Sequence, residues 1–490
     1  MKKNHKLILL LILFIALSLR LFKLNQLFYF SMDEALIAFR ALGLFKYKRP
    51  FLIGGISPLQ VHLPPHFYYL ASIFLAVFNF NPLGWGIWGA LLGGLTITSL
   101  YFFVRKISNQ KTAIISSLLY SISFTAVFFD RHFWPLSFNP LLTIIILFLL
   151  TKLNKKTIKY YFLLFFCLAF IITADPSNIP LILTSLFFLI KNLKKIKLKL
   201  AAISFSVVGL IFLTPLLLFD LRHNWQNIKG IKRLFNTATI SHFSLQKFID
   251  FLLLVPRAMA RFFYSPQTDI FQLHSYCIPF ASARQYNLPI ILITVSIAIS
   301  IWFLFSAKKL IEKTISYLIL FYIFGITLFG ALGFSIFDHY LTGLLPIFAF
   351  IFAKLLTKLP KSISIIFLTI FISINLYQIS QAKNPYGLKY KQELVTWANK
   401  NLKNQEFSLE SVSKCHKENG LRYLFELTDN PPKQSFMDPN FAWLYSQSPS
   451  EKMSNKILLV TDKPLKSSLT VLNQKKFGAM NAYILENTEN

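Results

Sequence analysis

The chain has 490 residues, of which 54% are hydrophobic and only 14% are charged. A soluble domain carries about 25% charged residues, and its core has no room for 53 phenylalanines. These values exclude soluble enzymes and predict a polytopic α-helical membrane protein. The net charge of +31 does not indicate a nucleic-acid partner, because the excess of Lys and Arg lies mainly in short loops between apolar runs.

Eleven runs without Asp, Glu, Lys or Arg predict about eleven transmembrane helices in the lipid bilayer. They cover residues 7–19, 83–104, 112–129, 136–151, 160–174, 177–190, 200–219, 288–306, 314–334, 340–353 and 362–380. The first run follows three lysines but lacks a small-residue cleavage site, so we interpret it as an uncleaved first span.

The distribution of positive charge predicts how the chain crosses the membrane. The short loops on one side, with the N-terminal tail, carry 21 Lys and Arg, whereas the longer segments on the other side before residue 384 carry 16. Cytoplasmic loops are the richer in Lys and Arg, so we expect a plasma-membrane protein with a cytoplasmic N-terminus. The apolar stretch 65–82 then cannot cross, and we expect it to lie on the outer surface or to re-enter there.

Composition divides the chain into two predicted domains. Residues 1–383 form the membrane domain, with long outer loops at 20–82 and 220–287. Residues 384–490 have an ordinary composition and predict a small extracytoplasmic α/β domain. Its expected elements are a helix at 388–403 and strands at 456–461 and 482–485. The absence of a Walker loop or a GxGxxG motif argues against nucleotide binding on the inner face.

The first outer loop carries adjacent carboxylates at Asp33 and Glu34. An apolar setting raises the pKa of such groups, and a carboxylate placed there can take a proton from a hydroxyl nucleophile. The alternative is a solvated helix N-terminus, where acidic side chains suit the helix dipole.

Two further motifs lie on the same predicted side of the membrane. In Asp130-Arg131-His132, the arginine is able to hold a phosphate through two hydrogen bonds, or to anchor at lipid headgroups. In Asp338-His339-Tyr340, His339 or Tyr340 is able to donate to a phosphate, or to act as an interfacial anchor.

Together these motifs resemble the GT-C superfamily of membrane glycosyltransferases, in particular the branch of protein O-mannosyltransferases and aminoarabinose transferases. The matching features are the acid pair, a Pro-Pro-aromatic helix, a span with a basic inner turn, an arginine-bearing second outer loop and a His-Tyr start to a late span. They lie at Asp33–Glu34, Pro64–Tyr69, Tyr101–Lys106, Phe128–Arg131 and His339–Pro346.

The resemblance implies transfer of a hexose or pentose, with mannose favoured, from a polyprenyl-phosphate donor to an acceptor hydroxyl on the outer face. Asp33 would be the general base of a single inverting displacement, and Glu34 would assist or orient it. The lipid phosphate would lie among Arg131 and Tyr340, with His339 and Arg222 as further candidates. The acceptor is a protein, a glycan or a lipid.

Histidines and cysteines leave two questions open. His62 and His66 would line the acceptor side, act as plain interfacial histidines, or hold a divalent cation together with Asp33, and we assign no cofactor and no metal ligand. Cys277 and Cys415 both lie on the predicted outer side, where a disulfide between them is possible.

Two other functions compete with glycosyl transfer. One is a transporter or lipid-linked sugar flippase, although transporters usually place charged residues at the bilayer midplane and these spans are free of charge. The other is a non-catalytic scaffold of polysaccharide assembly that acts through residues 384–490.

Overall fold

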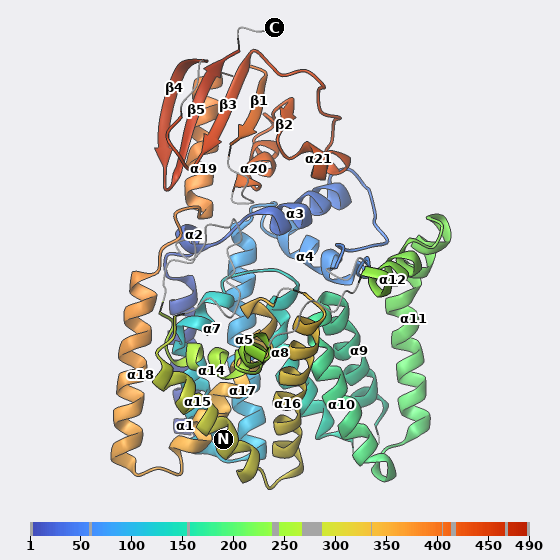
Figure 1. The fold of residues 1–490 in the computed structure, drawn as a ribbon, viewed down its shortest axis with the longest axis vertical. Helices are drawn as coiled ribbons and strands as arrows, with labels where there is room; N and C mark the ends of the chain where they lie inside the picture. Colours follow the sequence, from blue (N-terminus) through green and yellow to red (C-terminus); the bar gives the residue numbers. More distant parts are fainter. Residues whose placement is uncertain are drawn as a thin grey trace.

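The structure, a computed structural model, describes nearly all of the chain. A tall bundle of helices forms one part of the molecule, and a small sheet lies beyond one end of the bundle (Figure 1). The described residues are 3–57, 61–153, 157–237, 245–266, 287–334, 336–403, 405–412, 418–465 and 469–487. Cys277 and Cys415 lie outside them.

The bundle consists of helices whose axes follow the long axis of the molecule, together with shorter pieces between them (Figure 1). Its α-helices are α1 (Lys3–Leu21), α5 (Leu83–Ile107), α6 (Gln110–Ile122), α7 (Phe124–Phe129), α8 (Asn139–Leu150), α9 (Ile158–Ala174), α10 (Ile179–Lys191), α11 (Leu198–Arg222), α14 (Leu254–Phe263), α15 (Ile290–Ser306), α16 (Leu310–Ala331), α17 (Leu345–Leu356) and α18 (Lys361–Gln381).

Helix length and composition confirm the polytopic helical class. Within the described residues, five helical segments are long and apolar enough to cross a membrane, and five shorter apolar helices accompany them. The long segments are α5, α11, α16, 338–356 and α18. The total of eleven spans stays a prediction.

Two helices at the sides of the bundle expose large apolar side chains. On α11 these include Leu210 and Leu213, and on α18 they include Ile365 and Ile366. Continuous apolar surface of this kind is unfavourable in water and suits the hydrocarbon of a bilayer.

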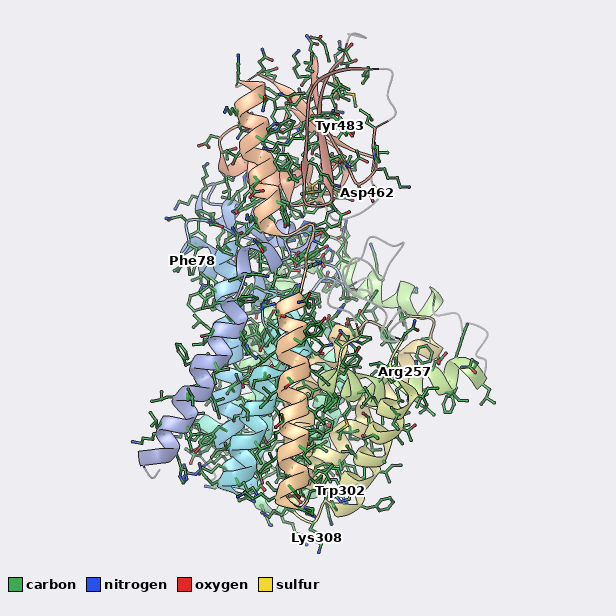
Figure 2. The ribbon with its side chains drawn as sticks, turned by 90° about the vertical axis from the view of Figure 1, so that its left-hand side faces the viewer. Phe78, Arg257, Trp302, Lys308, Asp462 and Tyr483 are labelled. Atoms are coloured by element: carbon green, nitrogen blue, oxygen red, sulfur yellow. The ribbon has the colours of Figure 1, made fainter. Side chains whose placement is uncertain are left out.

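One end of the bundle lies next to the sheet domain and the other end lies far from it. Trp302 and Lys308 lie at the end remote from the sheet, whereas Phe78 lies close to the junction with the sheet domain (Figure 2). The Lys-rich loop that begins at Lys308 is therefore separated from the sheet by the height of the bundle, as the charge distribution predicts.

Between the bundle and the sheet lie short helices of the first long loop. These are α2 (Leu24–Leu27), α3 (Met32–Phe45) and α4 (His66–Ala76). The later loop contributes α12 (Gln226–Thr237) and α13 (Leu245–Leu252), and α13 packs against α16 of the bundle. The 11 residues of α4 rise only about 16 Å, well short of a hydrocarbon core of about 30 Å. This length agrees with the expectation that 65–82 does not cross.

The chain ends in a five-stranded sheet with the order β2-β1-β3-β5-β4. β1 pairs in parallel with β2 and β3, whereas β5 pairs antiparallel with β3 and β4. The predicted helix and two strands are present as α19, β3 and β5, and β1, β2 and β4 were not predicted. The elements are α19 (Leu388–Leu402), β1 (Phe407–Ser411), α20 (Leu421–Leu427), β2 (Gln434–Ser435), α21 (Asp438–Phe441), β3 (Lys456–Thr461), β4 (Thr470–Phe477) and β5 (Met480–Glu486).

Candidate active site

The acid pair occupies the first turn of α3, and its two carboxylates have different surroundings. Ser31 is the N-cap, and its backbone N–H donates to Glu34 Oε2 at 3.1 Å. Glu34 is 2% exposed, whereas the Asp33 side chain is exposed. The sequence therefore places one carboxylate inside the structure as part of a helix cap and leaves its neighbour accessible.

Burial changes the protonation of one member of the pair. Burial raises the pKa of Glu34 to about 8, and the charge of the neighbouring Asp33 adds to this effect. Hydrogen bonds from the backbone and the charge of Lys391 act in the opposite direction. At neutral pH the buried member of the pair therefore holds its proton.

The sheet domain packs directly against α3. The ring of Phe39 lies 5.3 Å from that of Tyr423 and 5.1 Å from that of Tyr445, measured between centroids. Tyr47 Oη donates to Glu426 Oε1 at 3.3 Å, and Tyr423 Oη donates to the carbonyl of Phe80 at 2.8 Å. The acid-bearing helix is thus held between the helical bundle and the C-terminal domain (Figure 1).

Arg40, two turns along α3, orders the loop that follows. Its guanidinium donates to the carbonyls of Ile53 and Gly54. It also lies 5.1 Å from the ring centre of Tyr68 and 5.3 Å from that of Trp443 in the sheet domain. Because Arg40 is buried, these carbonyls and aromatic faces take the place of water around its charge.

The late His-Tyr motif forms a single 3₁₀ segment, η6 (Asp338–Leu344), in front of α17. Asp338 pairs with Arg261 of α14 at 2.6 Å, which fixes the start of the segment. The His339 ring packs edge-on against Trp134 and against Tyr340, each at 4.6 Å between centroids. The segment that follows the Asp130-Arg131-His132 motif therefore contacts the late His-Tyr motif.

Tyr340 connects this segment with the acid pair and with a cavity. Tyr340 is itself mostly buried, and it lies near enough to Asp33 and Asp175 for their carboxyl groups to influence it electrostatically. Tyr340 also lines a cavity of about 370 Å³ between α10 and α16. Most of the lining is apolar, including Leu183, Ile326 and Leu328.

A few polar groups line or neighbour this apolar cavity. Tyr322 Oη and Ser177 Oγ are buried without a hydrogen-bond partner among the described residues, and both residues line the cavity. Thr143 Oγ1 is also buried without a hydrogen-bond partner among the described residues. A Cβ at Gly343 would lie 2.9 Å from Thr143 Oγ1 and 3.2 Å from Tyr322 Oη, so the glycine leaves space beside both hydroxyls.

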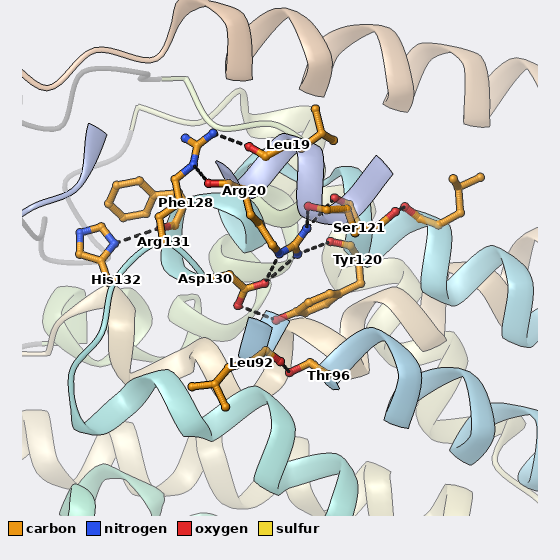
Figure 3. Close-up of polar contacts among 12 residues, drawn as sticks. Leu19, Arg20, Leu92, Thr96, Tyr120, Ser121, Phe128, Asp130, Arg131 and His132 are labelled. Carbon is orange, nitrogen blue, oxygen red and sulfur yellow. Dashed lines mark hydrogen bonds and ion pairs between the residues drawn. The ribbon is translucent and has the colours of Figure 1, made fainter. Parts of the chain in front are cut away.

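The Asp130-Arg131 motif serves mainly to join helices (Figure 3). Asp130 Oδ2 accepts from Arg20 Nη2 at 2.7 Å, and Asp130 Oδ1 accepts from Tyr120 Oη at 3.2 Å. A Cβ at Gly93 would lie 2.6 Å from Asp130 Oδ2, so α5 needs a glycine here. Arg131 donates to the carbonyls of Leu19 at 2.6 Å and Arg20 at 3.1 Å, at the C-terminal end of α1. Its assignment to a phosphate stays a prediction.

The remaining predicted residues lie around the loops. The ring of His66 stacks on Phe212 of α11 at 4.1 Å, and burial lowers the pKa of His66. His62 binds the side chain of Asn227 through its Nδ1 at 3.0 Å. Arg222 is exposed at the C-terminal end of α11. Across the described part of the chain, no group of three His, Cys, Asp or Glu residues is placed to hold a metal ion.

Sequence reasoning missed three features of this region. The sequence analysis places Arg20 at the start of the outer loop 20–82, Lys391 in the predicted helix 388–403 and Tyr322 in the predicted span 314–334, and it gives none of them a role. Their signal in the sequence is weak, because a single Arg, Lys or Tyr has no spacing pattern that separates it from its neighbours.

Residues 62–219 match the sequence profile of a family described as dolichyl-phosphate-mannose-protein mannosyltransferase. The predicted resemblance to GT-C glycosyltransferases is confirmed. The match also confirms the predicted enzyme class, because the family is one of glycosyltransferases. It covers α4, α5 and the Asp130-Arg131 motif, whereas Asp33 and Tyr340 lie outside the matched segment.

Other comparisons give more distant likenesses. A search of curated proteins gives no match. Among solved structures, ArnT from Cupriavidus metallidurans bound to undecaprenyl phosphate has 11% identity and a TM-score of 0.49, with 98% of each chain covered. The archaeal oligosaccharyltransferase AglB from Archaeoglobus fulgidus, in complex with an inhibitory peptide and a dolichol-phosphate, has 12% identity and a TM-score of 0.46, covering 89% of this chain and 65% of AglB.

Proposed function

We propose that the protein transfers a hexose or pentose from a polyprenyl-phosphate donor to an acceptor hydroxyl on the outer face of the plasma membrane. Mannose is the favoured sugar, since the family profile that matches residues 62–219 is that of dolichyl-phosphate-mannose-dependent transferases. The N-terminus would be cytoplasmic and the sheet domain extracytoplasmic. One observation carries the proposal: an exposed carboxylate, Asp33, acts electrostatically on a tyrosine that lines an apolar cavity.

The cavity between α10 and α16 is the proposed site of the lipid donor. Its volume of about 370 Å³ falls within the range of about 300–1,000 Å³ that is usual for small-molecule sites. Its apolar wall suits an isoprenoid chain. Buried hydroxyls without partners are rare, so Tyr322 and Ser177 are expected to gain hydrogen bonds from the polar end of the donor.

The chemical step would be a single displacement at the anomeric carbon. Asp33 takes the proton of the acceptor hydroxyl while the acceptor oxygen forms a bond to that carbon. The bond from the carbon to the phosphate oxygen breaks on the opposite side, and its electron pair leaves with the polyprenyl phosphate. The anomeric configuration is therefore inverted. The buried, protonated Glu34 holds the cap of α3 and leaves Asp33 as the charged member of the pair.

The other predicted residues take supporting roles in this proposal. Tyr340 would donate to the phosphate, with His339 packed against it. Arg131 and Arg222 would contribute positive charge near the leaving group, and His66 would lie on the acceptor side. One base suffices for the step, because the departing polyprenyl phosphate is already a stable anion.

A transfer assay on membranes that contain the protein tests the proposal. Radiolabelled polyprenyl-phosphate mannose, glucose and arabinose would be offered, with Asp33→Asn as the test variant. Loss of a general base lowers the rate by about 10²–10⁴-fold, so we expect transfer by wild type and almost none by the variant. Asp429→Asn is the matched control, because Asp429 is an exposed acid whose ion pair, at 3.6 Å, is with the exposed Lys46.

Three outcomes would contradict the proposal. Full activity of Asp33→Asn would remove the assigned base, and equal losses in both variants would indicate a general effect of lost charge. Counterflow of a lipid-linked sugar in proteoliposomes, unchanged in Asp33→Asn and without any transfer, would favour the flippase.

A further inference from the structure

The side chain of Lys391, on α19 of the sheet domain, ends beside the first turn of α3. Lys391 has no exposed surface. A lysine is rarely fully buried unless its charge is paired. Its Nζ donates to the carbonyl of Phe30, and it lies 6.0 Å from the ring centre of Tyr29. The C-terminal domain therefore delivers a buried positive charge to the segment that immediately precedes the acid pair.

The peptide group between Phe30 and Ser31 is held from both of its polar ends. Its carbonyl, on Phe30, accepts from Lys391. Its N–H, on Ser31, donates to Glu34 Oε2 at 3.1 Å. In a trans peptide the carbonyl and the N–H point in opposite directions, so Lys391 and Glu34 hold one peptide plane between them. Ser31 is the N-cap, and the orientation of this plane therefore sets where α3 begins and where Asp33 points.

Other contacts show that the domain is fixed at this junction. The Leu388 N–H donates to the carbonyl of Phe28 at 3.1 Å, and Asn384 Nδ2 donates to the carbonyl of Leu27 at 3.1 Å. The titratable groups that act on Lys391 are Glu34 and Glu418, the latter from the segment before α20, while Asp33 acts on Glu34 and all three carboxyl groups act on Tyr29. The lysine is thus placed by backbone contacts and faces two carboxyl groups.

We propose that Lys391 is a positioning residue for the catalytic carboxylate, and that the C-terminal domain is thereby a component of the active site. This inference rests on the proposed function of Asp33. The effect of Lys391 would pass through the peptide between Phe30 and Ser31, because Lys391 has no assigned contact with donor or acceptor.

The test compares Lys391→Met with wild type in the transfer assay, with kcat and the KM for the lipid donor measured separately. A misplacement of about 1 Å at a catalytic group lowers the rate by about 10²-fold, so we expect a fall of that order in kcat. The donor KM should stay near the wild-type value, because the donor cavity is lined by α10 and α16 and lies away from α19.

The matched control is Lys389→Met on the same helix. Lys389 is partly exposed and pairs with Glu393 at 3.8 Å, so its loss should leave kcat within about twofold of wild type. A fall in kcat for both lysine variants would indicate a general requirement for charge on α19 and would overturn the inference. Unchanged kcat in Lys391→Met would also overturn it.

A double-mutant cycle with Glu34→Leu, which removes the acceptor of the Ser31 N–H, makes the test specific. If both side chains hold the same peptide, the combined loss in kcat of Lys391→Met and Glu34→Leu is smaller than the product of the single losses. If the two losses in kcat simply multiply, Lys391 and Glu34 do not act through the same peptide group. If Lys391→Met is not recovered in the membrane, Lys391→Gln, which keeps a hydrogen-bond donor, takes its place in the cycle. Failure of the proposed function is distinguishable, because wild type would then show no transfer at all.

Discussion

The first two outer motifs of the chain both combine an acid with neighbouring polar residues, yet the structure uses them differently. Asp130 and Arg131 are buried, and their charges are met by Arg20, Tyr120 and the carbonyls that end α1. In the pair on α3, Glu34 is buried in a helix cap, whereas Asp33 is exposed. A charged motif in a membrane protein can therefore either join helices or present a carboxylate to a substrate. Whether the carboxylate is buried or exposed distinguishes the two cases.

The largest effect on stability that we predict comes from removing Arg20. Arg20 has no exposed surface and pairs with Asp130, so Arg20→Met leaves a carboxylate buried without its partner. Such a change destabilises a protein by about 3–5 kcal/mol, and we expect much lower abundance in the membrane and a lower Tm in detergent. Asp33→Asn, by contrast, should abolish transfer with little change in either quantity.

Two controls accompany the Arg20 variant. Lys46→Met removes one side of an exposed ion pair with Asp429 and should cost less than about 1 kcal/mol. Adding Asp130→Asn to Arg20→Met should restore part of the Tm, because the uncompensated charge is then gone. A Tm for Arg20→Met equal to that of wild type would show that the Asp130 motif does not join the helices as described.

Glu34 allows a second test, through the pH dependence of stability. Burial raises the pKa of Glu34 from 4.5 to about 8, so the folded state disfavours the charged form. The unfolded chain loses this proton near pH 4.5, and the stability that the proton gives to the folded state is therefore lost as pH rises from there through about 8. Glu34→Gln keeps an acceptor for the Ser31 N–H and has no proton to lose, so its Tm should exceed that of wild type by several degrees at pH 8.5 and by less at pH 5.

The matched control for this test is Glu393→Gln, since Glu393 is an exposed acid that pairs with Lys389. Its Tm difference from wild type should not change with pH in the same way. A constant difference between Glu34→Gln and wild type from pH 5 to 8.5 would show that Glu34 is not held protonated by burial.

The sequence was sufficient to predict the helical class and the positions of α19, β3 and β5, because these follow from local composition and periodicity. That 65–82 does not cross, and that Asp33, Glu34 and Tyr340 share one site, stay predictions from the charge of the loops and from the family resemblance. The pairings of Arg20 with Asp130 and of Lys391 with Phe30 join residues 110 and 361 positions apart. No local pattern encodes such contacts, because they depend on how helices and the sheet domain pack.

The smallest effect that we predict concerns Tyr322, which lines the cavity that we propose for the lipid donor. Tyr322→Phe removes a buried hydroxyl that has no partner in the described part of the chain. If the donor supplies that partner, the loss of one neutral hydrogen bond, about 0.5–1.5 kcal/mol, should raise the donor KM by about two- to tenfold with little change in kcat. Tyr317→Phe, on the same helix but packed on Phe187 at 4.3 Å, should leave the KM unchanged. An unchanged KM in Tyr322→Phe together with a higher Tm would instead mean that this hydroxyl is unsatisfied in the working enzyme and that the donor binds elsewhere, because relieving an unpaired buried group stabilises the fold whether or not a ligand reaches it.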